Sequence, residues 1–311
     1  MSDRTPSILR VVDPHVHLWD THVVSYPWLA NPAVAYSGDN RLLPQHYDVA
    51  AYLKDAQDFD VLGTVNIEGN PMDPVAEARW LQSLADKPVN RGQPSGIVAY
   101  ADLSQDDAPT ALACLAAFPN LRGIRQILNR HANPRFSYVA EDYLSNPTWR
   151  ENLRRLAHYG WSFDLQIYPS QAGSAAEVIQ LNPEVTFIIN HTGMLVDRSD
   201  VNGWREWRSA LCALADCDNT AIKLSGLAMF DHHWTIESFR PLVIEAIDCF
   251  GPRRSMFASN FPIDRLHGSY TSIWRAYAQI VSHMDALDQE NLFVNNAARY
   301  YRLTLARDDT A

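Results

Sequence analysis

Short apolar segments recur along the whole chain of 311 residues, and each is followed by a segment with helical periodicity. Many of the short segments are apolar at positions of both parities, which is typical of parallel strands that are covered on both faces. We predict strands at 8–16, 61–67, 96–101, 121–128, 161–167, 185–190, 221–224 and 254–259. We predict amphipathic helices at 74–85, 108–117, 148–158, 174–180, 204–215, 241–250 and 270–282.

Eight strand–helix alternations predict an α/β protein with a single (β/α)8 TIM barrel that occupies residues 1–311 as one domain. The competing architecture, an open doubly wound sheet, normally has a glycine-rich loop after its first strand. Here that strand ends in Asp13-Pro14-His15-Val16-His17, which contains no glycine. The long stretches 22–43 and 129–146 are rich in Pro, Asn and aromatic residues, and we expect them to form loops that cap the barrel mouth.

Composition narrows the classes of partner. The chain is 47% hydrophobic and carries a net charge of −10 without a basic block, which excludes global disorder and argues against a nucleic-acid or membrane partner. Four cysteines without a CxxC pair and an N-terminus without an apolar signal core favour reduced thiols and a cytoplasmic location. No apolar run approaches the ~20 residues of a membrane span. Nine Trp and thirteen Tyr leave room for a homodimer interface.

Three histidines follow predicted strands, at the barrel end where catalytic residues of this fold lie. His15 and His17 end the first strand, and their spacing puts both imidazoles on one face. This spacing suits two ligands of one metal ion, and it equally suits two hydrogen-bonding groups around a substrate. His191 follows the sixth strand, where it would supply a third metal ligand or a general base.

Charged residues lie at other strand ends. Glu68 would bind a metal, act as a base or pair with an arginine. Arg122 and Arg125 have opposite parity, so only one of them enters the barrel mouth, and we expect it to be Arg125, as a clamp for a carboxylate or an oxyanion. Lys223 either points inward to hold a substrate carboxylate or extends outward to solvent. The two inward cations would favour a small anionic or polyhydroxylated substrate.

Polar side chains complete the set of strand-end residues. Gln166 would present its amide to a substrate, and Ser225 shares a strand face with the lysine two residues before it. Asn260 takes the first polar position after the last strand, and Asp264 follows four residues later.

The chain resembles the amidohydrolase superfamily, and more narrowly the amidohydrolase-2 group, which includes sugar-acid lactonases and pyrone-dicarboxylate lactonases. The resemblance is carried by Asp13-Pro14-His15-Val16-His17-Leu18-Trp19, Tyr26-Pro27-Trp28-Leu29, Arg122-Gly123-Ile124-Arg125-Gln126, Phe163-Asp164-Leu165-Gln166, Ile189-Asn190-His191-Thr192-Gly193, Lys223-Leu224-Ser225-Gly226 and Met256-Phe257-Ala258-Ser259-Asn260-Phe261-Pro262. It implies a TIM barrel whose His15, His17 and His191 match the group's histidines. It also implies a hydrolase that opens a small lactone by water attack, with Trp28 among the substrate contacts.

Two departures from the superfamily pattern affect the expected chemistry. Gln166 stands where the fifth strand usually has a histidine, and Asn260 stands at the position of the usual aspartate. An amide cannot take a proton from water, so the base would be Asp264, Glu68 or His191. The resemblance leaves two options for a cofactor: one divalent metal ion, zinc first, held by His15, His17 and Glu68, or no metal, as in the pyrone-dicarboxylate lactonases.

Three alternative functions remain open at this stage. They are a lactone isomerase, an aromatic-acid decarboxylase of the same superfamily, and a barrel that binds a small molecule without catalysis. Proton release indicates hydrolysis of a lactone, a change of ring size without proton release indicates an isomerase, and CO2 release indicates a decarboxylase.

Overall fold

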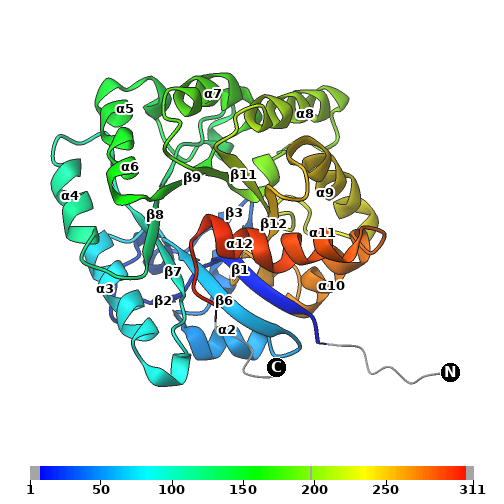
Figure 1. Cartoon of the computed structure of the whole chain (residues 1–311), viewed down its shortest axis with the longest axis horizontal. Helices are drawn as coiled ribbons and strands as arrows, with labels where there is room; N and C mark the ends of the chain where they lie inside the picture. The colour runs from blue at the N-terminus through cyan, green and yellow to red at the C-terminus, as the bar shows by residue number, and fades with distance from the viewer. Residues whose placement is uncertain (1–7, 197, 306–311) are drawn as a thin grey trace.

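A computed structural model describes residues 8–196 and 198–305, and within them eight parallel strands form one sheet that curls into a barrel (Figure 1). In spatial order these strands are β1 (Arg10–Val16), β6 (Asp60–Ile67), β7 (Gly96–Tyr100), β8 (Leu121–Ile127), β9 (Ser162–Gln166), β10 (Phe187–Ile189), β11 (Thr220–Leu224) and β12 (Ser255–Phe257). The ring closes where β1 meets the segment after β12: the Asn260 amide donates to the His15 carbonyl (2.9 Å) and the His17 amide donates to the Phe261 carbonyl (2.8 Å). The predicted barrel and its eight strands are confirmed.

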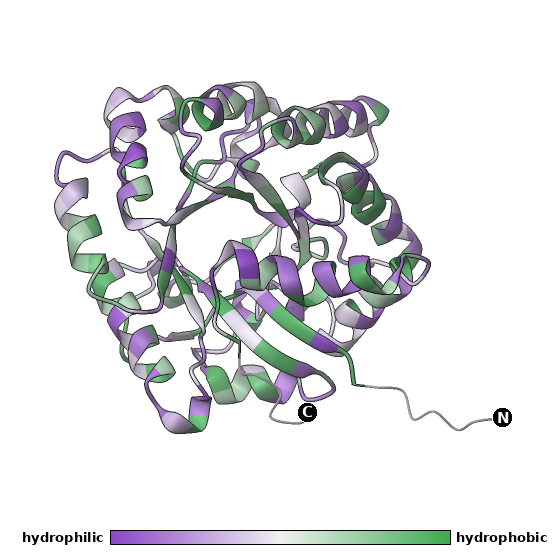
Figure 2. Ribbon diagram, viewed as in Figure 1, coloured by the Kyte–Doolittle hydropathy of each residue, from purple (hydrophilic) through white to green (hydrophobic). Residues whose placement is uncertain are grey.

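Helices surround the barrel, with their apolar faces toward the strands and their polar faces toward solvent (Figure 2). They are α2 (Val49–Asp55), α3 (Pro74–Ala85), α4 (Ala108–Leu115), α5 (Pro147–Arg154), α6 (Leu156–Tyr159), α7 (Ala172–Gln180), α8 (Val201–Ala215), α9 (Ile236–Phe250), α10 (Tyr270–Ile280), α11 (Ala286–Glu290) and α12 (Asn296–Tyr300). All seven predicted helices are present. Helix α9 begins before the predicted Pro241, because Thr235 caps it by accepting a hydrogen bond from the Ser238 amide (3.2 Å).

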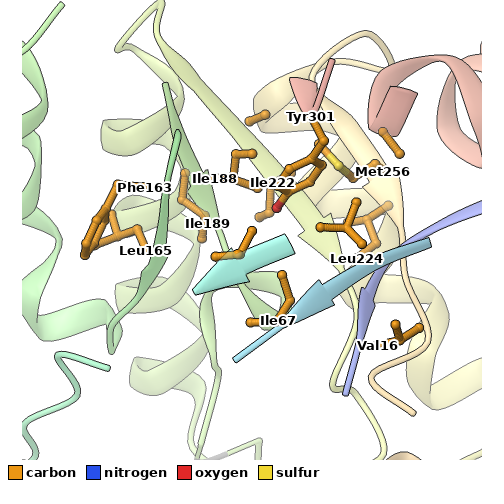
Figure 3. Packing of buried hydrophobic residues seen from close by; sticks show 14 of the residues in the cluster. Val16, Ile67, Phe163, Leu165, Ile188, Ile189, Ile222, Leu224, Met256 and Tyr301 are labelled. Carbon is orange, nitrogen blue, oxygen red and sulfur yellow. The ribbon is translucent and has the colours of Figure 1, made fainter. Parts of the chain in front are cut away.

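The two ends of the barrel differ in what covers them. Short elements cover the carboxyl ends of the strands: α1 (Pro27–Ala30), the hairpin of β3 (Val34–Ala35) and β4 (Gly38–Asp39), and a 3-10 turn at Pro134–Phe136. They belong to the two stretches that the sequence predicted as caps. In Figure 1, α12 crosses the other end of the barrel. Tyr301, which follows α12, lies among buried side chains of the strands (Figure 3) and donates its hydroxyl to Asp164 (2.9 Å).

The structure tests only part of what the sequence predicts about location and assembly. Within the described residues, no helix is long and apolar enough to cross a membrane. The N-terminal segment that lacks a signal core falls outside the described residues. The cytoplasmic location and the homodimer therefore stay predictions.

Candidate active site

The three histidines at the strand ends meet at one point inside the barrel mouth. The Nε2 atoms of His15 and His17 lie 3.2 Å apart, and the ring centroids of His15 and His191 lie 4.5 Å apart. All three side chains are buried. Burial lowers the pKa of His17 to about 3 and, together with nearby positive charges, holds the pKa values of His15 and His191 well below 6.5. The imidazoles are therefore neutral at pH 7.

Hydrogen bonds assign a tautomer to two of these rings. His17 Nδ1 lies 2.8 Å from the Ile67 carbonyl, so Nδ1 carries the proton and Nε2 carries the lone pair. The Lys223 ammonium lies 3.4 Å from His15 Nδ1, which makes that nitrogen the acceptor. His15 then carries its proton on Nε2 and donates it toward His17. The chain Lys223–His15–His17 is thus a consistent line of donors and acceptors.

His191 sits in a strained turn after β10. His191 and Thr192 have left-handed backbone angles (φ 53° and 54°), which are rare for residues other than glycine. The turn is held by two contacts: the Trp207 indole donates to the Thr192 carbonyl (2.8 Å), and the Ser225 amide donates to the Thr192 hydroxyl (3.2 Å). Strain of this kind is maintained where a side chain must point in one direction.

Two neighbours of that turn fix the His191 ring. Its Nδ1 lies 3.3 Å from the Ser225 hydroxyl. A Cβ at Gly226 would lie 2.5 Å from the same nitrogen, so only glycine allows the ring to approach here. The Ser225 hydroxyl can accept from Nδ1, and a ring that carries its proton on Nδ1 has its lone pair on Nε2.

Arg125 and Glu68 form a buried ion pair between β8 and β6. Arg125 Nε donates to a Glu68 carboxylate oxygen (2.6 Å) and Nη2 donates to the Glu68 carbonyl (2.7 Å). Nη1 donates to the Gln166 amide oxygen (3.2 Å), so three of the five guanidinium N–H groups are engaged and two remain for a ligand. Of the three roles expected for Glu68, the structure shows the pairing with an arginine.

Lys223 points inward and is fully buried. Its ammonium lies 2.5 Å from Asp164 on β9, and that carboxylate also accepts from Tyr301 (2.9 Å) and Asn190 (3.0 Å). The sequence suggested that Lys223 holds a substrate carboxylate, whereas the ammonium lies below the cavity and is held by Asp164. Both inward cations are thus paired with a carboxylate, which removes the excess positive charge that the sequence suggested.

Asp264 acts on the cavity only through Asn260. The Asn260 amide nitrogen donates to the Asp264 carboxylate (2.8 Å), and the Asn260 side chain lines the cavity beside His17. Burial raises the pKa of Asp264 to about 7. Asn260 also has a left-handed backbone (φ 58°). Asp264 therefore orients the Asn260 amide on the cavity floor.

A cavity of about 690 Å³ lies above these groups at the carboxyl ends of the strands. Five buried polar residues form its floor: His17, Arg125, Gln166, His191 and Asn260. Most of the residues that cover it come from the loops, among them Trp28, Tyr36, Phe136 and Tyr138. Of the predicted site residues, His15, Glu68, Ser225 and Asp264 lie behind the floor and contact it through hydrogen bonds, and Lys223 lies one step further back, against His15.

Sequence reasoning missed several contributors. Asp164 was noted only for sharing a face with Gln166, although a carboxylate in an apolar strand signals a buried partner. Tyr301 lies far away in the sequence and carries no motif. The ring-bearing loop residues Tyr36 and Tyr138 fall within the predicted caps, but no pattern singled them out.

The donor set does not fit a divalent metal ion. Both carboxylate oxygens of Glu68 are engaged, one by Arg125 and the other by the Asn70 amide (2.5 Å). His15 faces an ammonium where a metal-bound histidine usually donates to a carboxylate or carbonyl. In the part of the chain that the structure describes, no group of three His, Cys, Asp or Glu side chains is placed to hold a metal.

Comparison with known proteins identifies the family. The sequence profile of the amidohydrolase family matches residues 12–303, and the chain belongs to this family. An uncharacterized protein of Sinorhizobium fredii, y4mH, is 40% identical over 301 residues, which cover 96% of this chain and 100% of that protein. An L-fucono-1,5-lactonase of Burkholderia multivorans is 25% identical over 308 residues, covering 94% of this chain and 96% of the lactonase.

A solved structure shares the fold. The crystal structure of an amidohydrolase from Burkholderia multivorans with bound HEPES superposes with a TM-score of 0.79 at 21% identity, covering 94% of this chain and 99% of that one. A second crystal form of that amidohydrolase contains bound zinc and superposes with a TM-score of 0.78 at 20% identity, again over 94% of this chain and 99% of that one.

Proposed function

We propose that this protein is a lactonase that opens the ring of a small lactone by water attack on its carbonyl carbon. The observation that carries the proposal is that His191 and Arg125 lie together on the floor of one cavity. His191 offers a basic nitrogen, and Arg125 offers unengaged N–H donors. The family membership and the L-fucono-1,5-lactonase relatives support the same reaction class.

The base is His191. Of the three bases that the sequence left open, only His191 lines the cavity, whereas Glu68 is paired with Arg125 and Asp264 lies behind Asn260. In the proposed reaction the water oxygen attacks the lactone carbonyl carbon while Nε2 of His191 takes the water proton. No step uses a metal ion, because the donor set does not fit one.

Arg125 stabilises the charge that forms on the carbonyl oxygen. Its two unengaged N–H groups donate to the oxyanion of the tetrahedral intermediate, and Glu68 and Gln166 hold the guanidinium in place. Collapse of the intermediate breaks the ring C–O bond, and the leaving alkoxide takes the proton back from His191. The product is a hydroxy acid, which ionises at neutral pH and releases one proton per turnover.

The pH dependence follows from burial. Because the pKa of His191 lies well below 6.5, the base stays unprotonated through the neutral range and is lost only in more acidic solution. We expect kcat/KM to be flat from about pH 6.5 to 8 and to fall at lower pH. An acidic limb centred at or above pH 6.5 would contradict His191 as the base.

The test is proton release from a panel of lactones, with His191→Ala as the decisive variant. We expect turnover to fall by at least about two orders of magnitude, the range for loss of a general base, without a change in the far-UV spectrum. His158→Ala, at an exposed position on α6, is the matched control and keeps its activity. Near-native turnover in His191→Ala would refute the mechanism. CO2 release, or ring-size change without proton release, would refute the lactonase.

A further inference from the structure

Three aromatic rings from the capping stretches line the cavity, and we call Tyr36, Phe136 and Tyr138 the aromatic roof. The ring centroid of Tyr36 lies 5.8 Å from that of Phe136 and 5.9 Å from that of Tyr138. The rings come from the β3–β4 hairpin and from the loop after β8, so the roof joins the two capping stretches. The Phe230 ring stacks on the Tyr36 ring, with their centroids 5.1 Å apart.

The polar atoms of the roof and walls are already engaged. The hydroxyls of Tyr36 and Tyr138 hydrogen-bond to each other, and the Trp28 indole donates to the Gly69 carbonyl (2.7 Å). These three side chains therefore present ring surface to the cavity. Aliphatic and thioether groups of Ile127, Met229 and Ile263 continue the apolar lining. A hydroxyl placed against these groups would lose its hydrogen bonds to water without replacement.

The floor, in contrast, has polar groups suited to one acyl group and little net charge. Arg125 is neutralised by Glu68, and Lys223 by Asp164. The cavity is thus polar at its floor, and aromatic and aliphatic groups make up most of the remaining lining, which also includes Ser37, Asn40, Asn70, Arg135 and Ser137. Its volume of about 690 Å³ is within the usual range for a small organic ligand.

Given the proposed lactonase function, we infer that the substrate is a lactone with a flat apolar group, such as a fused or attached aromatic ring, and few hydroxyls. The ester binds at the floor and the apolar group stacks under the aromatic roof. This class differs from the polyhydroxylated or anionic lactone that the sequence suggested.

The experiment compares dihydrocoumarin, an aryl lactone, with glucono-1,5-lactone, and measures the affinity of their ring-opened acids by calorimetry. We expect kcat/KM and product affinity to favour the aryl compounds by about tenfold or more, the effect of one or two aromatic contacts. Higher values for the sugar compounds would overturn the inference. Selective binding of the aryl acid without hydrolysis of either lactone would refute the lactonase and leave the substrate class standing.

Variants of the roof give a second readout. Tyr36→Ala should raise KM for dihydrocoumarin about tenfold and change KM for glucono-1,5-lactone less, because only the aryl group contacts the ring. Tyr36→Phe keeps the ring and gives the smaller change. Tyr159→Ala, on the surface of α6, is the matched control. An equal loss for both lactones would show that the roof does not select the substrate.

An independent observation concerns the contact between α8 and α9. Cys212 Sγ and Cys249 Sγ lie 2.7 Å apart, and both side chains are partly exposed. One helical turn earlier, Arg208 pairs with Glu245 across the same contact (2.6 Å), so the two helices run in matching register. Burial raises the pKa of Cys249 to about 12, and the Arg208 charge opposes this shift. The two sulfurs are in contact but unbonded, and a shift of less than about 1 Å would bring them to the ~2.05 Å of a disulfide bond.

We propose that Cys212 and Cys249 form a reversible disulfide with a small disulfide oxidant such as glutathione disulfide. The Cys212 thiolate attacks one sulfur of the oxidant and releases the first glutathione thiolate. The Cys249 thiolate then attacks Cys212 Sγ in the mixed disulfide and releases the second. The protein loses two electrons and two protons, and the oxidant is reduced to two thiols.

Mass spectrometry and thiol counting of the full chain test this step. After treatment with glutathione disulfide we expect two of the four thiols to disappear with a loss of about 2 Da, reversed by dithiothreitol. Cys114→Ser should still form the bond, and Cys212→Ser should not. Four remaining thiols, or a stable glutathione adduct without ring closure, would overturn the proposal.

Discussion

Two buried ion pairs in the barrel differ in what surrounds them. Arg125, on the cavity floor, pairs at 2.6 Å with Glu68 behind it, and its hydrogen bonds to Glu68 and Gln166 engage three of the five guanidinium N–H groups. Lys223 and Asp164 pair at 2.5 Å below the floor, where Tyr301, Asn190 and His15 complete the contacts. The pairs share the same charges, but only the first can act on a ligand.

Arg125 is placed to touch a substrate, whereas Lys223 helps to hold the cavity floor in place. An arginine retains donors after it is anchored, because its planar fork carries five N–H groups. The Lys223 ammonium gives two of its three donors to Asp164 and His15, and its burial outside the cavity lining keeps it away from a ligand. A substitution in the Lys223–Asp164 pair, which we call the lower pair, should therefore change mainly stability. A substitution in the Arg125–Glu68 pair, which we call the upper pair, should change mainly activity.

The largest expected effect is that of Lys223→Met on stability. Removing the ammonium leaves Asp164 as a buried unpaired carboxylate, which lowers the free energy of unfolding by about 3–5 kcal/mol. Urea denaturation measures the change. The double variant Lys223→Met with Asp164→Asn should recover most of it, because the uncompensated charge is gone.

A matched control uses an exposed pair. Arg208→Met breaks the ion pair with Glu245 at the helix surface, where solvent screens the charges, and should change the free energy of unfolding far less than Lys223→Met does. Equal losses in the two single variants, or no recovery in the double variant, would contradict the role given to the lower pair.

The next effect is that of Arg125→Lys on turnover. Lysine keeps the charge beside Glu68 but loses the fork that holds the oxyanion, so kcat should fall about a hundredfold. Thermal unfolding should change less than in Lys223→Met. Unchanged kcat in a folded Arg125→Lys variant would show that the two pairs do not differ as described.

The smallest effect is on the pH dependence of stability near the upper pair. Burial, with the nearby Glu68 charge, raises the pKa of Glu77 from 4.5 to about 8. The unfolded chain then releases this proton earlier than the folded chain, so the free energy of unfolding falls as pH rises from 4.5 to 8.

The glutamine side chain in Glu77→Gln does not titrate. The free energy of unfolding of this variant should therefore fall less steeply between pH 4.5 and 8 than that of the parent protein. Urea denaturation at several pH values measures the slope, which one group can change by at most about 1.4 kcal/mol per pH unit. Glu184→Gln, on the surface, keeps the slope of the parent protein. Parallel curves for Glu77→Gln and its parent would contradict the raised pKa.

Local pattern predicted much of the barrel and part of the site. Strand parity placed His15 beside His17 and allowed only one of Arg122 and Arg125 to enter the barrel mouth. Arg125 was favoured because it lies nearer the carboxyl end of the strand, and the Arg122 guanidinium instead donates to the Pro119 carbonyl (2.8 Å). The loop composition of 22–43 and 129–146 predicted the caps. The short helices α2, α11 and α12 were not predicted, because they are too short for a periodic signal.

The sequence by itself determined the eight strands, the carboxyl-end location of the histidines and the types of the polar groups there, since these follow from alternation along single strands. Only the tertiary structure decided which carboxylate meets which cation, that Lys223 lies below the floor, and that Tyr301 reaches Asp164. Such contacts join residues up to 137 positions apart. Their partners depend on how the closed barrel brings strands together, which no local periodicity encodes.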